Sequence, residues 1–538
     1  MPLCNLPEDI LAILLSRCVG NRTSTACELK RILPLLAVCR LWRRLAAPPV
    51  YSHAFVQYGD HPTRVASLPI RIGAAEEPTD VVVKTNLDLI TMAGYASAVK
   101  RVQIDVHCLA NPFPGWREVI QRMRAVATEW RAVQLTATMH PDFYSFNGSS
   151  NADTTYYMDD IAEVADALAA LMPDVCRLEC AGVNRCSIAR SLYGRLASHY
   201  AGQLRRLDSQ HLIAVLQGCL FTKLRRFHID YGRGIDYQLP HMASGELVDM
   251  SLVNGPANHS WASFSTNSGS RTIEFAKLKR LYVEYGSTYR GDGAAVRHCD
   301  GHPWGLYFTG LERLFIRSSQ DVCPLLAYAV LPAHMEVVSI HMKSTSYKDH
   351  ADLVLPATKR LIIGISMDSC GDPSGLPAIN RILENARGSE SLELNIEDDM
   401  LAMVPESITC TALTHLQVWP TTSVDAMFAT IRRLPYLAKL ALYDLSMSEI
   451  QADISIPGAD VDAAVEPLSP SLRSLTINYD KGRQSSDTAV AVKKHLLLRI
   501  PTLTELSSAQ TPKSPLVRFV EEYAPRHPHL SGVELILS

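Results

Sequence analysis

Residues 278–283 read Leu-Lys-Arg-Leu-Tyr-Val and are a clear copy of a pattern that runs through most of the chain. The pattern is an apolar residue, two polar residues, a second apolar residue, one polar residue and a third apolar residue. Apolar and polar residues alternate over its second half, which predicts a short strand with one buried face. Other clear copies begin at Val99, Leu204, Leu224, Leu311, Leu413, Leu437 and Leu472, and weaker ones lie at Val133, Val175, Leu247, Val337, Leu361, Leu392, Leu503 and Val533.

The spacing of these strands indicates parallel pairing. Successive copies start roughly 20 to 45 residues apart, which is a repeat period and not a hairpin spacing. A strand, a helix and a return to a like strand form a right-handed parallel unit, and stacked units bury a continuous core. The predicted fold class is α/β with parallel strands and helical returns; the alternative is a large α/β domain with ordinary crossovers. Expected helices are 116–130, 159–172, 188–200, 378–386, 424–434 and 488–499.

The N-terminal 58 residues have a different, helical pattern. Pro7 suits the first turn of a helix, and Glu8 and Asp9 place negative charge at the positive end of its dipole. Two or three short helices in about 50 residues enclose little core of their own, so this piece packs on the rest of the chain or on a partner. Its apolar stripes are Leu6, Ile10, Leu11 and Leu14, followed by Leu35, Leu36, Val38, Cys39, Trp42 and Leu45.

This N-terminal pattern resembles an F-box. The F-box opens with Leu-Pro and acidic and aliphatic residues, and it closes with Val-Cys-(Lys/Arg)-x-Trp, which residues 38–42 match. The trailing Val50, Tyr51 and Phe55 look like the version common in fungal F-box proteins. Residues 19–32 make the link between the two halves longer than usual, which leaves the pairing of the helices open. The alternative is an ordinary helical cap on a larger domain.

The strand pattern in turn resembles leucine-rich repeats of the irregular kind found behind F-boxes. The L-x-x-L-x-(I/V/L) core matches, but the usual Asn or Cys four residues after the second leucine is mostly absent. We therefore expect a less regular solenoid. Together the resemblances imply an F-box over 1–58, a linking segment over 59–98 and an irregular leucine-rich-repeat solenoid over 99–538.

The resemblances imply a substrate-recognition subunit of an SCF-type (Skp adaptor–cullin–F-box) ubiquitin ligase. The F-box would bind a Skp-family adaptor and through it a cullin, the repeats would bind an unidentified protein substrate, and other subunits would supply catalysis. The alternative is a leucine-rich-repeat scaffold without a ligase role. A third possibility, an enzyme on a repeat scaffold, is not supported by any motif in the sequence. The expected adaptor-binding residues are Leu6, Pro7, Ile10, Leu11, Leu14, Leu36, Val38, Cys39, Trp42 and Leu45.

Some of these residues must instead hold the helices together, and the sequence does not sort the two sets. Trp42 is the expected anchor, because a buried aromatic side chain contributes a large contact area for little lost rotamer freedom.

Composition argues against several other functions. The chain has 538 residues, 47% of them hydrophobic and 20% charged, as expected of a soluble protein with a substantial core. A net charge of −3 gives no case for nucleic acid, and no apolar run is long enough to predict a membrane span. The 13 cysteines are scattered without a C-x-x-C pair, which favours reduced thiols and a cytoplasmic or nuclear location. Phosphate-binding and hydrolase motifs are absent, so neither enzymatic activity nor a cofactor is expected.

Pairs of basic residues recur at matching positions of separate repeats. They are Arg205 and Arg206, Arg225 and Arg226, and Lys279 and Arg280. They form either a solvated edge that discourages sheet aggregation or a basic site for an acidic or phosphorylated partner segment.

Three longer insertions, 139–157, 255–271 and 286–305, are predicted to be loops on one face, where partners often bind. The last contains His298-Cys299-Asp300-Gly301-His302, the most metal-like cluster of the chain. It lacks the partner ligands that a tetrahedral zinc site needs, so no metal is expected.

Overall fold

The computed structural model forms two compact units, Met1–Ile273 and Glu274–Ser538, and each is described by itself. The structure describes residues 7–19, 33–59, 82–108, 112–141, 157–181, 187–210, 219–230, 241–255, 272–285, 305–318, 325–326, 329–342, 347, 355–365, 379, 381–383, 388–396, 412–418, 422–446, 467–479, 486–508 and 513–537.

The first unit begins with helices α1 (Glu8–Val19) and α3 (Arg40–Val50), separated by the 3-10 helix η2 (Leu33–Ala37). The Leu11 N–H donates to the carbonyl oxygen of Pro7 (3.0 Å), so α1 starts where proline and two acidic residues predict a helix start. Cys39 caps α3, its sulfur accepting from the N–H of Trp42 (3.5 Å). The two helices enclose a small apolar core formed by Leu11, Leu15, Ala46 and Val50, with Phe55.

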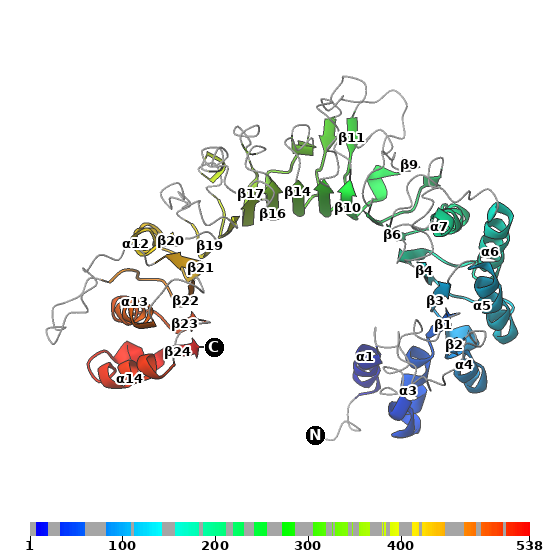
Figure 1. Cartoon of the computed structure of the whole chain (residues 1–538), viewed down its shortest axis with the longest axis horizontal. Coiled ribbons are helices and arrows are strands. Elements are labelled where there is room, and N and C mark those ends of the chain that lie inside the picture. Colours follow the sequence, from blue (N-terminus) through cyan, green and yellow to red (C-terminus); the bar gives the residue numbers. More distant parts are fainter. Residues whose placement is uncertain are drawn as a thin grey trace, which may run out of the picture. The chain divides into compact units, whose positions relative to one another are not determined.

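A parallel sheet follows in the first unit, with each strand paired to the next. In order across the sheet its strands are β1 (His53–Gly59), β3 (Arg101–Cys108), β4 (Gln134–Pro141), β5 (Arg177–Ala181), β6 (Arg206–Gln210), β8 (Arg226–Asp230) and β10 (Asp249–Gly255). The short strand β2 (Val82–Thr85) pairs antiparallel with β1. Helices α5 (Phe113–Val126), α6 (Met158–Leu171) and α7 (Ser187–Tyr200) lie on one side of the strands, after α4 (Leu87–Ala93) (Figure 1).

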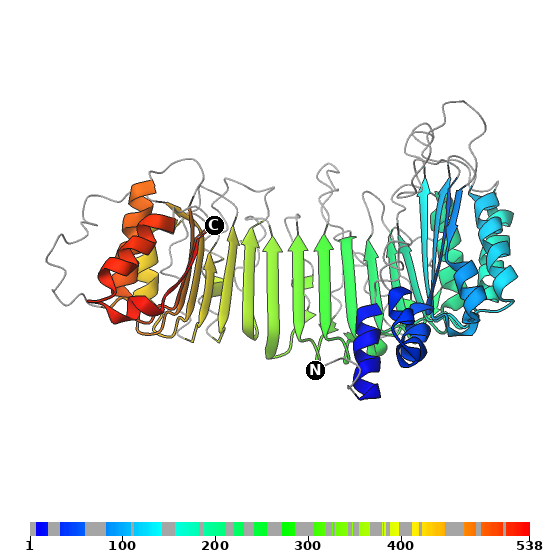
Figure 2. The ribbon, with the colours of Figure 1, turned by 90° about the horizontal axis from the view of Figure 1, so that it is seen from below.

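The second unit is built the same way, with parallel strands side by side (Figure 2). In order they are β12 (Arg280–Tyr285), β14 (Arg313–Ser318), β16 (His334–Met342), β17 (Ala357–Ile365), β18 (Ser391–Ile396), β19 (His415–Val418), β21 (Lys439–Ser446), β22 (Ser474–Tyr479), β23 (Glu505–Ser508) and β24 (Glu534–Leu537). Its helices include α12 (Val424–Arg433), α13 (Ser486–Arg499) and α14 (Lys513–Tyr523).

The predicted α/β fold with parallel strands is confirmed. Every copy of the strand pattern named above lies in a strand. Most of these strands begin one or two residues after the first apolar residue of the copy, whereas those that contain Val337, Leu361 and Leu392 begin before it. Strand β8 shows why: Phe227 and Ile229 are buried, whereas Arg226 and His228 reach the solvent-facing side. Period-two alternation thus places one apolar row in the core of each unit.

The sheet begins earlier in the chain than the predicted boundaries at residues 58 and 99. Strand β1 lies within the segment assigned to the F-box, and β2 and α4 lie within the segment assigned to a link. Strand β1 is buried on almost every residue, so its sequence, HAFVQYG, lacks the alternation that marks the later strands. Helix α14 was also not expected from the sequence.

A phenylalanine three residues before the first leucine of a copy joins neighbouring repeats of the second unit. Phe275 and Phe308 are fully buried, and their rings stack at 5.0 Å between centroids with 12° between planes. Beside this pair, the backbone of Gly310 passes close to the carbonyl oxygen of Ala276.

Replacing Gly310 by Ala is expected to lower the free energy of unfolding by about 1–3 kcal/mol. A Cβ at Gly310 would lie 2.6 Å from the Ala276 carbonyl oxygen, a backbone atom that has no rotamer to escape to. Urea unfolding measures the change. Gly202→Ala is the control, because its Cβ would meet nothing within 4 Å, and equal effects of the two variants would contradict the prediction.

No helix in the part of the chain that the structure describes has the length and apolar content needed to cross a lipid bilayer.

Candidate binding surfaces

Helix α1 is apolar on two sides, and only one of them is covered. Leu11 and Leu15 are 1% and 3% exposed and pack on α3. Ile10, Ile13 and Leu14 are 47%, 55% and 39% exposed. These three residues, which we call the α1 outer stripe, follow the i, i+3, i+4 spacing of one helix face. A helix with apolar residues all round is normally buried, so this stripe is the strongest candidate for a partner surface.

Most of the other residues predicted to bind an adaptor are either exposed or packed in the core between the helices. Pro7, Val38 and Cys39 are exposed, and Val38 is 54% exposed. Leu36, Trp42 and Leu45 are partly buried and pack against the core between the helices. Leu6 and residues 20–32, which include most of the long link, lie outside the described residues. Ile13 was missed, although its spacing of three from Ile10 is a signal that the sequence carries.

Trp42, the expected anchor, therefore helps to hold the helix pair. Its indole nitrogen is buried and has no hydrogen-bond partner within the described ranges. The pair is also joined at its surface, where Arg44 and Glu8 form an ion pair (2.6 Å). Because both side chains are more than half exposed, that pair contributes little to stability.

The basic residues predicted in the first unit fall at the start of two neighbouring strands. Arg206 and Arg226 are partners in register on β6 and β8, and Arg177 on β5 is the next partner of Arg206. We call these three residues the arginine row. Arg206 is bound by Asp208 (Nε to Oδ2, 2.6 Å), whereas no described residue forms a side-chain hydrogen bond or ion pair with Arg177 or Arg226. Arg177 was not predicted.

Arg205 and Arg225 precede these strands and are exposed. They too form no side-chain hydrogen bond or ion pair within the part of the chain that is described. Several cations therefore gather at one end of β5, β6 and β8, with one carboxylate, that of Asp208, directly paired.

In the second unit the two predicted basic residues have different surroundings. Lys279 forms an ion pair with Glu312 (2.5 Å), whereas the guanidinium of Arg280 lies over the ring of Phe315, 5.6 Å from its centroid. Further cross-strand pairs join Arg313 to Glu336 (3.0 Å) and Arg360 to Glu393 (2.7 Å). Much of this edge thus consists of ion pairs between neighbouring strands.

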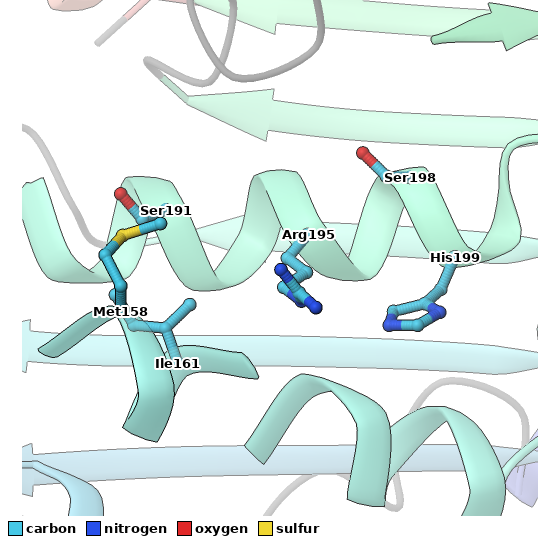
Figure 3. A pocket seen from close by; sticks show the side chains of 6 residues that line it. All are labelled: Met158, Ile161, Ser191, Arg195, Ser198 and His199. Carbon is cyan, nitrogen blue, oxygen red and sulfur yellow. The ribbon is translucent and has the colours of Figure 1, made fainter. Parts of the chain in front are cut away.

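A shallow groove of about 380 Å³ lies between α6 and α7 (Figure 3). Arg195 and His199 point toward α6, where Asp166 binds both (3.6 and 2.6 Å), and Ser198 points to the other side of α7 (Figure 3). The Ser198 hydroxyl donates to the carbonyl oxygen of Gly194 (2.9 Å). Serine, histidine and aspartate are therefore close here without the geometry of a catalytic triad.

Residues 298–302 and nearly all of the three predicted insertion loops lie outside the described residues. Within the described ranges, no group of three or more His, Cys, Asp and Glu side chains is placed to hold a metal ion.

A search of protein-family models finds no match to this sequence, and a search of curated proteins finds none either. The two resemblances therefore rest on the motifs quoted above.

Proposed function

We propose that this chain is a substrate-recognition subunit of an SCF-type ubiquitin ligase. Its N-terminal helices would form an F-box that binds a Skp-family adaptor, and its strands would form an irregular leucine-rich-repeat solenoid that binds the target. The observation that carries the proposal is the α1 outer stripe, which lies within the segment that resembles an F-box.

The exposed stripe has a physical cost that a partner would remove. Fully burying an aliphatic side chain is worth about 1.5–3 kcal/mol, so covering the three half-exposed side chains would contribute several kcal/mol to an interface. Leu11 and Leu15 keep α1 attached to α3 without using this stripe. The helix pair is therefore held together by one face of α1 and leaves the other for association.

The remainder of the chain fits the second half of the proposal. Parallel strands that each present polar residues on one face provide an extended surface, and the arginine row supplies cations for an acidic target segment. In this proposal no residue of the chain performs bond chemistry. Catalysis belongs to other subunits, and the chain contributes by positioning the target.

The test is co-purification of a Skp-family adaptor with the full chain. We expect Ile13→Glu/Leu14→Glu to reduce adaptor binding at least a hundredfold, because two carboxylates would have to be buried in an apolar contact. Met92→Glu on α4 is the matched control, since Met92 is also an exposed apolar residue (85%), and it should bind as the wild type does. These positions are better than Leu11 or Trp42, whose replacement would also loosen the helix pair.

The competing function is a repeat scaffold whose N-terminal helices cap the sheet. It is favoured by one observation, the presence of Phe55 of β1 in the core between α1 and α3. A wild-type chain that does not bind the adaptor, or a double variant that binds it equally well, would support the scaffold and contradict the ligase role.

A further inference from the structure

The solvent-facing side of β12 and β14 carries an aromatic pair flanked by arginines. In register, Arg280 lies beside Arg313, Tyr282 beside Phe315 and Glu284 beside Arg317. The alternate residues of both strands are buried, so these six residues share the opposite side of the sheet. They form a continuous surface on two neighbouring strands of one unit.

The centre of this surface is apolar. The Tyr282 and Phe315 rings are tilted at 35° with 6.4 Å between centroids, and both side chains are partly exposed. The same register row continues to β16, where Ser339 is small and buried (5% exposed), and then to β17, where Ile362 is partly exposed. Exposed aromatic and aliphatic side chains in one row on a sheet are a typical contact surface for another protein segment.

In the neighbouring row, a histidine ring lies over a glycine. His341 on β16 is the register partner of Gly364 on β17. A Cβ at Gly364 would overlap the His341 ring, so the ring lies over the glycine backbone. The missing side chain thus lets the imidazole lie along the sheet beside the aromatic row.

The charges around the row have an excess of positive sign. Arg280 is held over the Phe315 ring, and no described residue forms a hydrogen bond or an ion pair with the side chain of Arg280 or Arg317. The one carboxylate among the six residues of β12 and β14, Glu284, accepts a hydrogen bond from the Tyr282 hydroxyl (2.7 Å). Beyond Ile362 the row continues to Glu393, which pairs with Arg360. Burial and this hydrogen bond raise the pKa of Tyr282 to about 12, so the phenol stays protonated. Arg313 is already paired with Glu336.

We propose that the surface formed by Arg280, Tyr282, Phe315, Arg317 and Ile362 binds an extended acidic protein segment through one apolar side chain. The apolar side chain would cover the row from Tyr282 to Ile362, and carboxylates on either side of it would pair with Arg280 and Arg317. Aromatic and arginine side chains are the residues that most often dominate such interfaces, and Arg280 is already ordered by its contact with Phe315. The proposal extends the proposed function, because the segment would belong to the target.

The proposal is tested by phage display: the full chain is immobilised without any adaptor, and peptides that bind it are selected from a random dodecapeptide library. We expect the enriched peptides to be acidic with one aliphatic or aromatic residue. A synthetic peptide of the enriched sequence, followed by fluorescence anisotropy, should bind more weakly as salt rises, because arginine–carboxylate pairs are screened. Phe315→Ala and Arg317→Glu should each weaken binding at least tenfold.

Matched controls lie on and just after α12 in the same unit. Arg432→Glu makes the same charge change at an exposed arginine, and Tyr436→Ala removes an aromatic side chain that is 64% exposed. Both should bind the peptide as the wild type does. Circular dichroism and urea unfolding verify that all four variants fold.

The proposal is overturned if selection yields no enrichment, if the enriched peptides are basic or neutral, or if Phe315→Ala binds as the controls do. If a single-stranded oligonucleotide competes with the peptide equally well, the surface instead binds nucleic acid by stacking of bases on its aromatic rings. A chain that selects acidic peptides but fails to bind the adaptor would remove the ligase role alone, so the two failures are distinguishable.

Discussion

Replacing Lys493 by Met is expected to stabilise the chain at pH 7 and to remove a dependence of stability on pH above 7. Lys493 lies on α13 with a side chain that is fully buried, and its Nζ donates to the Ser508 hydroxyl at the end of β23 (2.6 Å). Burial lowers the pKa of Lys493 from 10.5 to about 7, because the ammonium form is poorly solvated there. Methionine fills similar space without a charge.

The sign follows from proton binding. Between pH 7 and pH 10.5 the unfolded chain keeps the lysine proton and the folded chain releases it, so stability rises with pH by up to about 1.4 kcal/mol per unit. Below pH 7 both states are protonated, and the full cost of the buried charge is present. Lys493→Met should therefore exceed the wild type most at pH 7 and below, and the gap should close toward pH 10.5.

Urea unfolding midpoints from pH 6 to pH 10 measure this effect. Lys494→Met is the control, because it makes the same substitution at the next residue, whose ammonium lies over the ring of Phe519 (5.3 Å). That variant should keep the slope of the wild type. Parallel curves for the wild type and Lys493→Met would show that the buried amine does not titrate in this range.

Two leucines of α1 should respond differently to the same substitution: Leu11→Ala should mainly lower stability, and Leu14→Ala should mainly lower adaptor binding. Leu11→Ala removes a side chain from the core between α1 and α3 and should cost the helix pair about 2–5 kcal/mol. Leu14→Ala removes a side chain that is 39% exposed and should cost less than about 1 kcal/mol. In return, Leu14→Ala should weaken adaptor binding without disturbing the fold.

Hydrogen exchange of the amides of α1 separates the two effects, because it reports local opening of one helix within a large chain. Leu11→Ala should speed exchange along Glu8–Val19, and Leu14→Ala should leave it unchanged. If Leu14→Ala also speeds exchange, the outer stripe contributes to the fold and not to a partner surface.

The sequence predicts the strands well, because burial on one face imposes a period of two that is visible in residues such as Leu224 to Ile229. It predicts β1 poorly, because a strand covered on both faces has no such period. The division of α1 into a covered and an open face could not be predicted for a related reason. Both faces are apolar, and only the position of α3 decides that Leu11 is buried and Leu14 is not.

The side-chain contacts of the basic pairs depend on the register between strands that are distant in sequence. Lys279 and Arg280 look alike in the sequence, yet one meets Glu312 and the other meets the ring of Phe315. By contrast, Arg177 has the same position in the Val175 copy as Arg206 has in the Leu204 copy, so the repeat pattern does place it in the arginine row. The repeated pattern thus predicts which positions align across strands, but not which neighbouring side chain each cation contacts.

The cross-strand ion pairs of the second unit have a consequence for how such a chain changes its length over evolution. In both Lys279–Glu312 and Arg313–Glu336, the cation lies at or just before the start of the earlier strand. The carboxylate lies just before the next strand (Glu312) or near its start (Glu336). A deletion that joins Lys279 directly to Arg313 would remove one repeat. It would bring Lys279 beside Glu336, so that opposite charges would again be neighbours. One repeat could thus be lost at this place while opposite charges still meet at the new junction.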